Sequence, residues 1–166
     1  MTGTLWSLAL ALAIFIAVHM VPVVPGLRAA MINAWGKRVY RALFSILSLA
    51  GLVWIVFAHK DAPQILLWEG PDWFRLIPLA AMPLVLILLA TMPSDGIKKV
   101  TRHPLLWAIF LWATAHIPTN GDAASLMLFG AFALFALIDQ PLADARTRRE
   151  EPEDWAEKSA PSSALP

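Results

Sequence analysis

The chain has 166 residues, of which 58% are hydrophobic and only 15% are charged. Soluble domains carry about a quarter charged residues, so this composition excludes an ordinary soluble domain and is typical of an integral membrane protein. The net charge of +1 gives no indication of nucleic-acid binding, and the absence of cysteine excludes disulfides, thiolate metal sites and a cysteine nucleophile.

Five apolar runs follow one another and predict transmembrane helices, because about 20 apolar residues in a helix cross a bilayer core. The runs are 5–24, 42–58, 76–92, 105–118 and 123–138. The last two predict a helical hairpin, since Asn120-Gly121 is a turn signal and Asp122 can cap the following helix. We predict an all-α fold, a polytopic membrane helix bundle of about five transmembrane helices over residues 1–142.

The basic residues lie almost entirely on one side of this predicted topology. Eleven of the 13 fall in the loops 25–41 and 93–104 and in the tail, and only Lys60 and Arg75 fall on the opposite side. The positive-inside rule then places the N-terminus in the periplasm and the C-terminus in the cytoplasm of a bacterial inner membrane. The lipid bilayer is the expected partner of the apolar runs and basic blocks. Residues 143–166 are rich in charge, serine and proline, which predicts a disordered cytoplasmic tail.

Two histidines, His19 and His116, stand inside predicted spans, where an ionisable side chain is costly and needs a reason. At 1.5 Å per residue their Cα atoms differ in depth by roughly 10 Å. Two imidazoles and a metal can bridge such an offset, so a haem with two axial histidines is geometrically possible. The alternative is that each histidine only hydrogen-bonds across helices. A bare zinc site would need further ligands, and none is expected at this depth.

A second candidate site is the basic segment 98–104, which precedes the fourth run. Pro104 suits the first turn of a helix, so Arg102 and His103 are expected at the cytoplasmic headgroup level. The segment could be a helix start with lipid anchors. It could also bind an anionic group, such as a haem propionate or a phosphate, with Arg28 and Arg41 contributing from the same side.

Asp139 ends the last apolar run on the same side as these basic residues, and we expect it to be a structural partner of Arg102 or Arg146. The sequence shows neither a Ser-His-Asp set nor paired carboxylates, so hydrolase chemistry has little support.

Several motifs occur in one order along the chain. They are His19, 36–45 (GKRVYRALFS), 48–52 (SLAGL), 62–63 (AP), 67–68 (LW), 102–104 (RHP), 111–116 (LWATAH), 120–122 (NGD), 125–126 (SL) and 128–130 (LFG). Together they resemble the NnrU family of bacterial membrane proteins over about residues 5–142. The resemblance implies an inner-membrane protein associated with nitrite and nitric oxide metabolism in denitrification. Lys37 departs from the glutamate that we expect more often in the family.

The chain is also similar to the plant zeta-carotene isomerase, an enzyme of the same superfamily as the NnrU proteins that uses a haem b. This resemblance implies haem b as the cofactor and His19 and His116 as its metal ligands. Arg28, Arg102 and His103 are the expected further cofactor-binding residues. Ala113 stands where the isomerase has a cysteine, a departure that argues against the isomerase's ligand-switching chemistry and not against haem.

Three functions follow, and whether the protein is an enzyme stays open. The first is a haem-binding protein that is redox-active or isomerase-like. The second is a non-enzymatic accessory or assembly factor, with components of membrane reductases as partners. The third is a small methyltransferase, because the Arg-His-Pro motif looks like that of isoprenylcysteine carboxyl methyltransferases. The flanking cofactor-binding sequence of those enzymes is not evident here.

Overall fold

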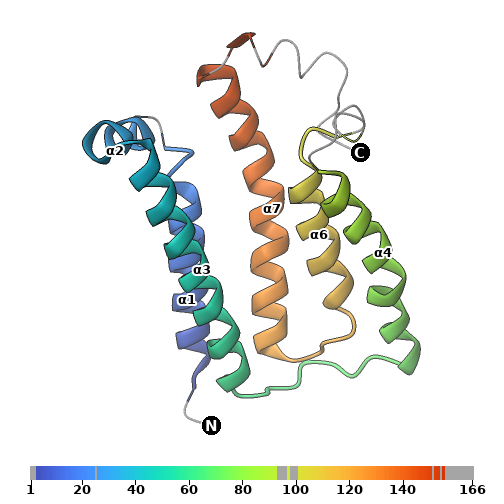
Figure 1. Ribbon diagram of the computed structural model, residues 1–166. Helices are drawn as coiled ribbons and strands as arrows, with labels where there is room; N and C mark the ends of the chain where they lie inside the picture. The colour runs from blue at the N-terminus through green and yellow to red at the C-terminus, as the bar shows by residue number, and fades with distance from the viewer. Residues whose placement is uncertain are drawn as a thin grey trace. The chain divides into compact units, whose positions relative to one another are not determined.

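The computed structural model describes residues 3–24, 26–92, 97, 101–150, 152–153 and 155. These residues form an all-helical fold, as the sequence predicted (Figure 1). The elements are α1 (Leu5–Met20), α2 (Leu27–Trp35), α3 (Lys37–Asp61), the 3-10 helix η1 (Asp72–Arg75), α4 (Leu76–Thr91), α6 (Pro104–His116) and α7 (Ala123–Glu150). Within the described ranges, β pairing is limited to an isolated bridge between Leu66 and Asp122.

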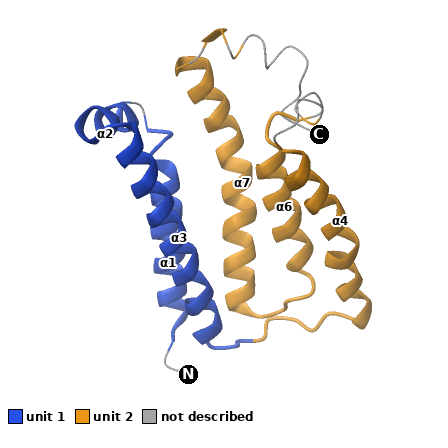
Figure 2. Cartoon of the chain, in the orientation of Figure 1, with its two compact units in different colours: residues 1–65 blue, residues 66–166 orange. Residues whose placement is uncertain are grey.

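The chain divides into two compact units, Met1–Ile65 and Leu66–Pro166, which Figure 2 shows in different colours. In the first unit α1 and α3 pack antiparallel, because Gly3 lies against Asp61 and Phe15 lies against Gly51. A Cβ atom at Gly51 would come within 3.2 Å of the Phe15 ring, so glycine permits this close approach. The short helix α2 packs against α3.

In the second unit α6 packs against both α4 and α7, and Figure 1 shows it between these two helices. Alanines on α6 form both contacts. Ala108 packs with Val85 and Leu88 of α4, and Ala113 packs with Phe129 and Ala133 of α7. Small side chains at these positions let the neighbouring helices approach closely, which is the usual way in which membrane helices pack.

Three helices are long and apolar enough to cross a bilayer. They are Lys37–Asp61, Asp72–Thr91 and Ala123–Glu150. Helix α1 has 16 residues and α6 has 13, whereas a span needs about 17–25. All five predicted apolar helices are therefore present near their predicted positions, but only three meet the length of a span, and a count of five spans stays a prediction.

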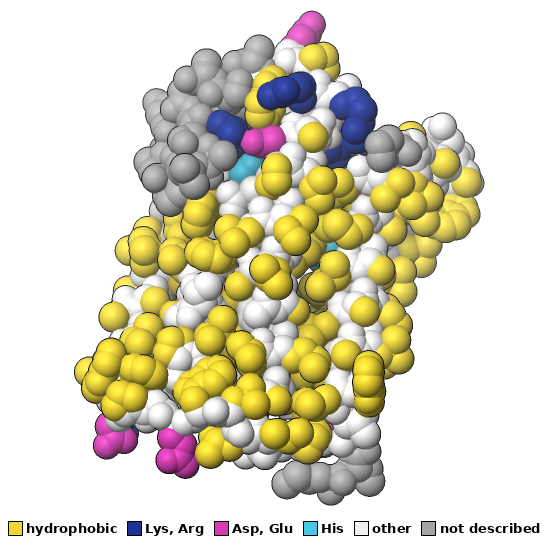
Figure 3. Space-filling view, turned by 180° about the vertical axis from the view of Figure 1, so that it is seen from behind, with side chains coloured by type: hydrophobic (Ala, Val, Ile, Leu, Met, Phe, Trp, Pro, Cys, Tyr) yellow, Lys and Arg dark blue, Asp and Glu magenta, His cyan; other side chains and the backbone are white. Residues whose placement is uncertain are grey.

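The flanks of the long helices expose large apolar side chains. Ile46 on α3, Leu79 on α4 and Leu134 on α7 are each more than 60% exposed. Figure 3 shows the same pattern on one face, where hydrophobic side chains cover the helix flanks and charged side chains gather toward the helix ends. In water this surface would be unfavourable, whereas lipid tails match it.

The helix boundaries differ from the sequence prediction in several places, and α3, for example, covers Lys37–Asp61 where the predicted run was 42–58. Helix α1 ends at Met20 and not at 24, since Pro22 has no N–H with which to continue the helix. The predicted loop 25–41 contains α2, bounded by Gly26 and Gly36 at φ 77° and 82°, a conformation that glycine adopts without strain. Helix α7 continues to Glu150, so residues 143–150 are helical where we predicted the start of a disordered tail. Alanine, arginine and glutamate in this stretch are good helix formers.

Candidate functional site

His19 lies in the last turn of α1, and its ring contacts two aromatic side chains. Its Nδ1 is 2.8 Å from the backbone oxygen of Phe15. Its ring lies 4.1 Å from the ring of Phe15 and 5.4 Å from that of Phe44 on α3, centroid to centroid. A carbonyl oxygen can only accept, so Nδ1 donates the hydrogen bond and, in the neutral ring, Nε2 carries the lone pair.

His116, the last residue of α6, repeats this arrangement in the second unit. Its Nδ1 is 2.7 Å from the backbone oxygen of Trp112, four residues back. Its ring stacks on Phe129 of α7, with centroids 5.0 Å apart and an interplanar angle of 24°, and lies 5.7 Å from the Trp112 ring. The same tautomer follows, with the lone pair of the neutral ring on Nε2.

This arrangement is suited to metal ligation. Ligating histidines usually donate the other ring N–H to a backbone carbonyl or carboxylate, which fixes the tautomer and the ring orientation. Within the described ranges, no three His, Asp or Glu side chains gather into a metal-binding group. A cofactor such as haem brings most of its own ligands, so it needs only one or two histidines from a protein.

The residues around His116 explain the Asn-Gly-Asp motif that follows it. The Asn120 side chain donates to the backbone oxygen of His116 at 2.8 Å, and Asp122 accepts from the Ser125 N–H at 2.9 Å, capping α7. The backbone oxygen of Gly121 accepts from the N–H of Leu67 and of Trp68. The hairpin and the capping role of Asp122 are thus confirmed, and the turn also anchors the segment before η1.

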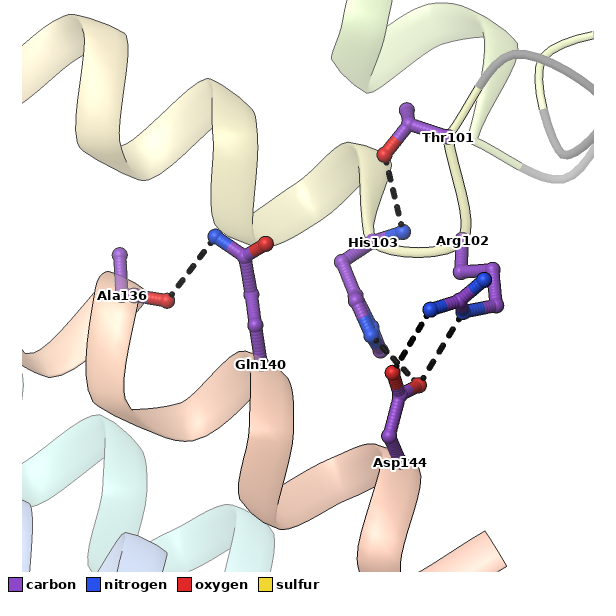
Figure 4. A network of polar contacts seen from close by, with 6 residues as sticks. All are labelled: Thr101, Arg102, His103, Ala136, Gln140 and Asp144. Carbon is purple, nitrogen blue, oxygen red and sulfur yellow. Dashed lines mark hydrogen bonds and ion pairs between the residues drawn. The ribbon is translucent and has the colours of Figure 1, made fainter. Parts of the chain in front are cut away.

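Arg102 and His103 meet a shared carboxylate on α7 (Figure 4). His103 Nε2 lies 2.9 Å from Asp144 Oδ1, and Arg102 Nη2 lies 2.9 Å from Asp144 Oδ2. Arg102 Nε also donates to Oδ1 at 3.3 Å. All three side chains are less than 20% exposed. Before them, the fully buried Thr101 accepts the backbone N–H of His103 on its hydroxyl.

Asp144 is the functional-site residue that the sequence prediction missed. The predicted tail includes Asp144, whereas its carboxylate holds the Arg102 guanidinium. A pairing of Asp139 with Arg102 or Arg146 stays a prediction. The sequence carries only a weak signal, because Asp144 lies four residues before Arg148, the spacing of an ion pair on a helix. In the structure Trp155 lies over both Arg102 and Arg148, at 5.3 and 5.0 Å. An anionic ligand at Arg102 would compete with Asp144.

The remaining predicted site residues are distributed between the units. Arg28 is half-buried on α2 of the first unit, together with His19. Arg102, His103 and His116 belong to the second unit. Lys98 and Lys99 lie outside the described residues. A joint site that combines His19 with His116, or Arg28 with Arg102, stays a prediction.

Apolar helices long enough to cross a bilayer, with apolar side chains exposed on their flanks, define a helical membrane protein. The chain belongs to the NnrU family, since the family model described as NnrU protein matches residues 7–166. No curated protein and no solved structure matches the chain. Family membership suggests a function related to nitrogen-oxide metabolism. The match also runs through residues 143–166, which include Asp144 and Trp155.

Proposed function

We propose that this NnrU protein binds haem b in the bacterial inner membrane and serves nitrite or nitric oxide metabolism, with His19 and His116 as iron ligands. One observation carries the proposal. Both histidines donate Nδ1–H to the backbone oxygen four residues back and lie against a phenylalanine of the neighbouring helix. This is the second hydrogen bond that a ligating histidine usually makes, and both histidines make it.

The side chains around both rings fit a flat apolar macrocycle. Phe15 and Phe44 surround His19, and Trp112 and Phe129 surround His116. Arg28, Arg102 and His103 are the cationic or hydrogen-bonding groups that would meet the propionates near the headgroups. When bound, haem would supply one-electron redox chemistry. The protein's own residues fix the imidazole tautomers and keep the rings away from bulk water.

An isomerase-like exchange of iron ligands is the less favoured form of this function. In the plant enzyme that this superfamily resembles, a cysteine precedes the second histidine by three residues, and Ala113 stands at that position here. Ala113 is fully buried against Phe129 and Ala133. A methyl group there cannot ligate iron, so we propose that both histidines stay bound in both oxidation states.

The visible spectrum of the protein purified from haem-replete cells tests the proposal. We expect a Soret band that His19→Ala and His116→Ala each abolish or shift. His59→Ala is the matched control, because His59 also lies in the last turn of an apolar helix and has no role in the proposed site. A colourless wild-type protein, or a spectrum unchanged in both variants, would contradict haem binding. The non-enzymatic accessory function for membrane reductases would then be preferred.

A further inference from the structure

Two buried hydroxyls on α3, those of Tyr40 and Ser48, have no hydrogen-bond partner among the described residues. Tyr40 is only 9% exposed. Helical hydroxyls elsewhere in the chain behave differently, since Thr91 and Thr114 each donate to the backbone oxygen four residues back, at 2.6 and 2.7 Å. A buried polar group without a partner is costly and calls for an explanation, such as a ligand.

Tyr40 lies beside the candidate iron ligand of the first unit. Its ring stacks on Phe44 with centroids 6.4 Å apart, and Phe44 in turn lies 5.4 Å from the ring of His19. Tyr40 and Ser48 are placed one turn before and one turn after Phe44 on the same face of α3, about 6 Å along the helix in each direction. Phe44 is thus the aromatic side chain that connects the rings of His19 and Tyr40, and only a ligand as wide as a macrocycle would reach from His19 to the Tyr40 hydroxyl.

The charges at this end of α3 indicate the chemistry of that ligand. Lys37 and Arg41 are within one turn of Tyr40, and Arg28 lies on α2, which packs against α3. The first unit has a single acidic residue, Asp61, at the opposite end of α3, about 36 Å from Lys37 at 1.5 Å per residue. Basic side chains thus gather at the end of α3 where Tyr40 lies, whereas Ser48 lies in the apolar middle of the helix.

We propose that the Tyr40 hydroxyl donates a hydrogen bond to a carboxylate of the ligand that His19 holds. For haem b this carboxylate is a propionate, so the inference rests on the proposed function. The bond would give Tyr40 the partner that it lacks within the chain. It would also place the propionate edge of the macrocycle toward Lys37 and Arg41, and its apolar edge toward the middle of the helix.

Titration of haem-free protein with hemin tests the inference, followed by the Soret band. We expect Tyr40→Phe to weaken hemin binding about tenfold, the scale of one hydrogen bond to a charged group. Ser45→Ala, which removes an exposed hydroxyl from α3, and Ser48→Ala, which removes the other buried one, should leave the affinity unchanged. With the dimethyl ester of hemin, which lacks the carboxylate charge, wild type and Tyr40→Phe should bind almost equally.

Thermal unfolding of the haem-free protein gives an independent readout. Removing an unpaired buried hydroxyl should leave the midpoint of Tyr40→Phe equal to or above that of wild type, because its desolvation cost disappears. A clearly lower midpoint without haem would show that the hydroxyl is structural and would overturn the inference. Equal hemin affinities of wild type and Tyr40→Phe would overturn it as well. If the affinities are equal, a loss of binding in His19→Ala would still support haem binding. A wild-type protein that binds no hemin would contradict both the inference and the proposed function.

Discussion

His103 and Asp144 are joined by a 2.9 Å contact between Nε2 and Oδ1, although 41 residues separate them in the sequence. The carboxylate can only accept, so Nε2 donates, and in the neutral ring the lone pair lies on Nδ1. The same carboxylate holds Arg102 at two nitrogens. Asp144 therefore ties the start of α6 to the C-terminal part of α7 and fixes the orientation of His103.

Asp144→Ala should lower the free energy of unfolding by about 2 kcal/mol, because it removes the carboxylate from a poorly exposed arginine and leaves three N–H donors, two of Arg102 and one of His103, to be satisfied otherwise. Asp72→Ala is the matched control. It breaks an ion pair with Arg75 whose side chains are 70% and 96% exposed, and such pairs contribute at most about 1 kcal/mol. Thermal or urea unfolding in detergent measures both variants. Equal effects would show that the Asp144 contacts are not formed in solution.

Much of this fold could be predicted from the sequence, because apolar runs identify membrane helices directly. The five runs correspond to α1, α3, α4, α6 and α7. Helix α2 was missed because its nine residues lack a long apolar run. The helical residues 143–150 were missed because a charged segment resembles a solvated tail, and the ion pair that holds Asp144 forms between distant segments.

The sequence could identify the individual histidines of the candidate site, but not the side chains that they contact. An ionisable side chain in an apolar run is conspicuous, so His19 and His116 could be singled out at once. Their contacts with Phe44 and Phe129 depend on which helix faces which, and a periodic pattern in one helix does not encode that pairing. The missing hydrogen-bond partner of the Tyr40 hydroxyl could not be predicted either, since tyrosine is common at the ends of membrane helices.

Trp155 contacts Arg102 and Arg148 through its ring face. Trp155→Ala should therefore lower the stability of the protein by about 0.5–1 kcal/mol, the usual contribution of cation–π pairs near the surface. Trp6→Ala serves as the control, because Trp6 is 84% exposed. Unfolding midpoints of both variants in the same detergent measure the difference. An unchanged midpoint for Trp155→Ala would support the original interpretation of residues 143–166 as a tail without structural contacts.

Gly121 should tolerate no side chain. A Cβ atom there would lie 1.9 Å from the backbone oxygen of Trp68, a contact that only a backbone shift could relieve. We expect Gly121→Ala to cost about 1–3 kcal/mol, as overpacking usually does. Gly130→Ala is the paired control, because a Cβ atom at Gly130 meets nothing within 4 Å. This substitution should stabilise α7 by about 0.5–1 kcal/mol. Unfolding in detergent should therefore move the two midpoints in opposite directions, and a common direction would contradict the close packing at Gly121.

Cysteine labelling can decide between five membrane spans and three. The chain has no cysteine, so a single introduced thiol is the only target of a maleimide. Gln64 is exposed between α3 and η1, and Glu150 is exposed at the end of α7. If all five apolar helices cross the bilayer and the C-terminus is cytoplasmic, Gln64→Cys lies in the periplasm and Glu150→Cys in the cytoplasm. If only α3, α4 and α7 cross, both lie on the same side.

We expect an impermeant maleimide to label Gln64→Cys in intact cells and Glu150→Cys only after lysis. Labelling of both before lysis, or of neither, would exclude the five-span topology, and labelling of Glu150→Cys alone would reverse the orientation that the positive-inside rule predicts.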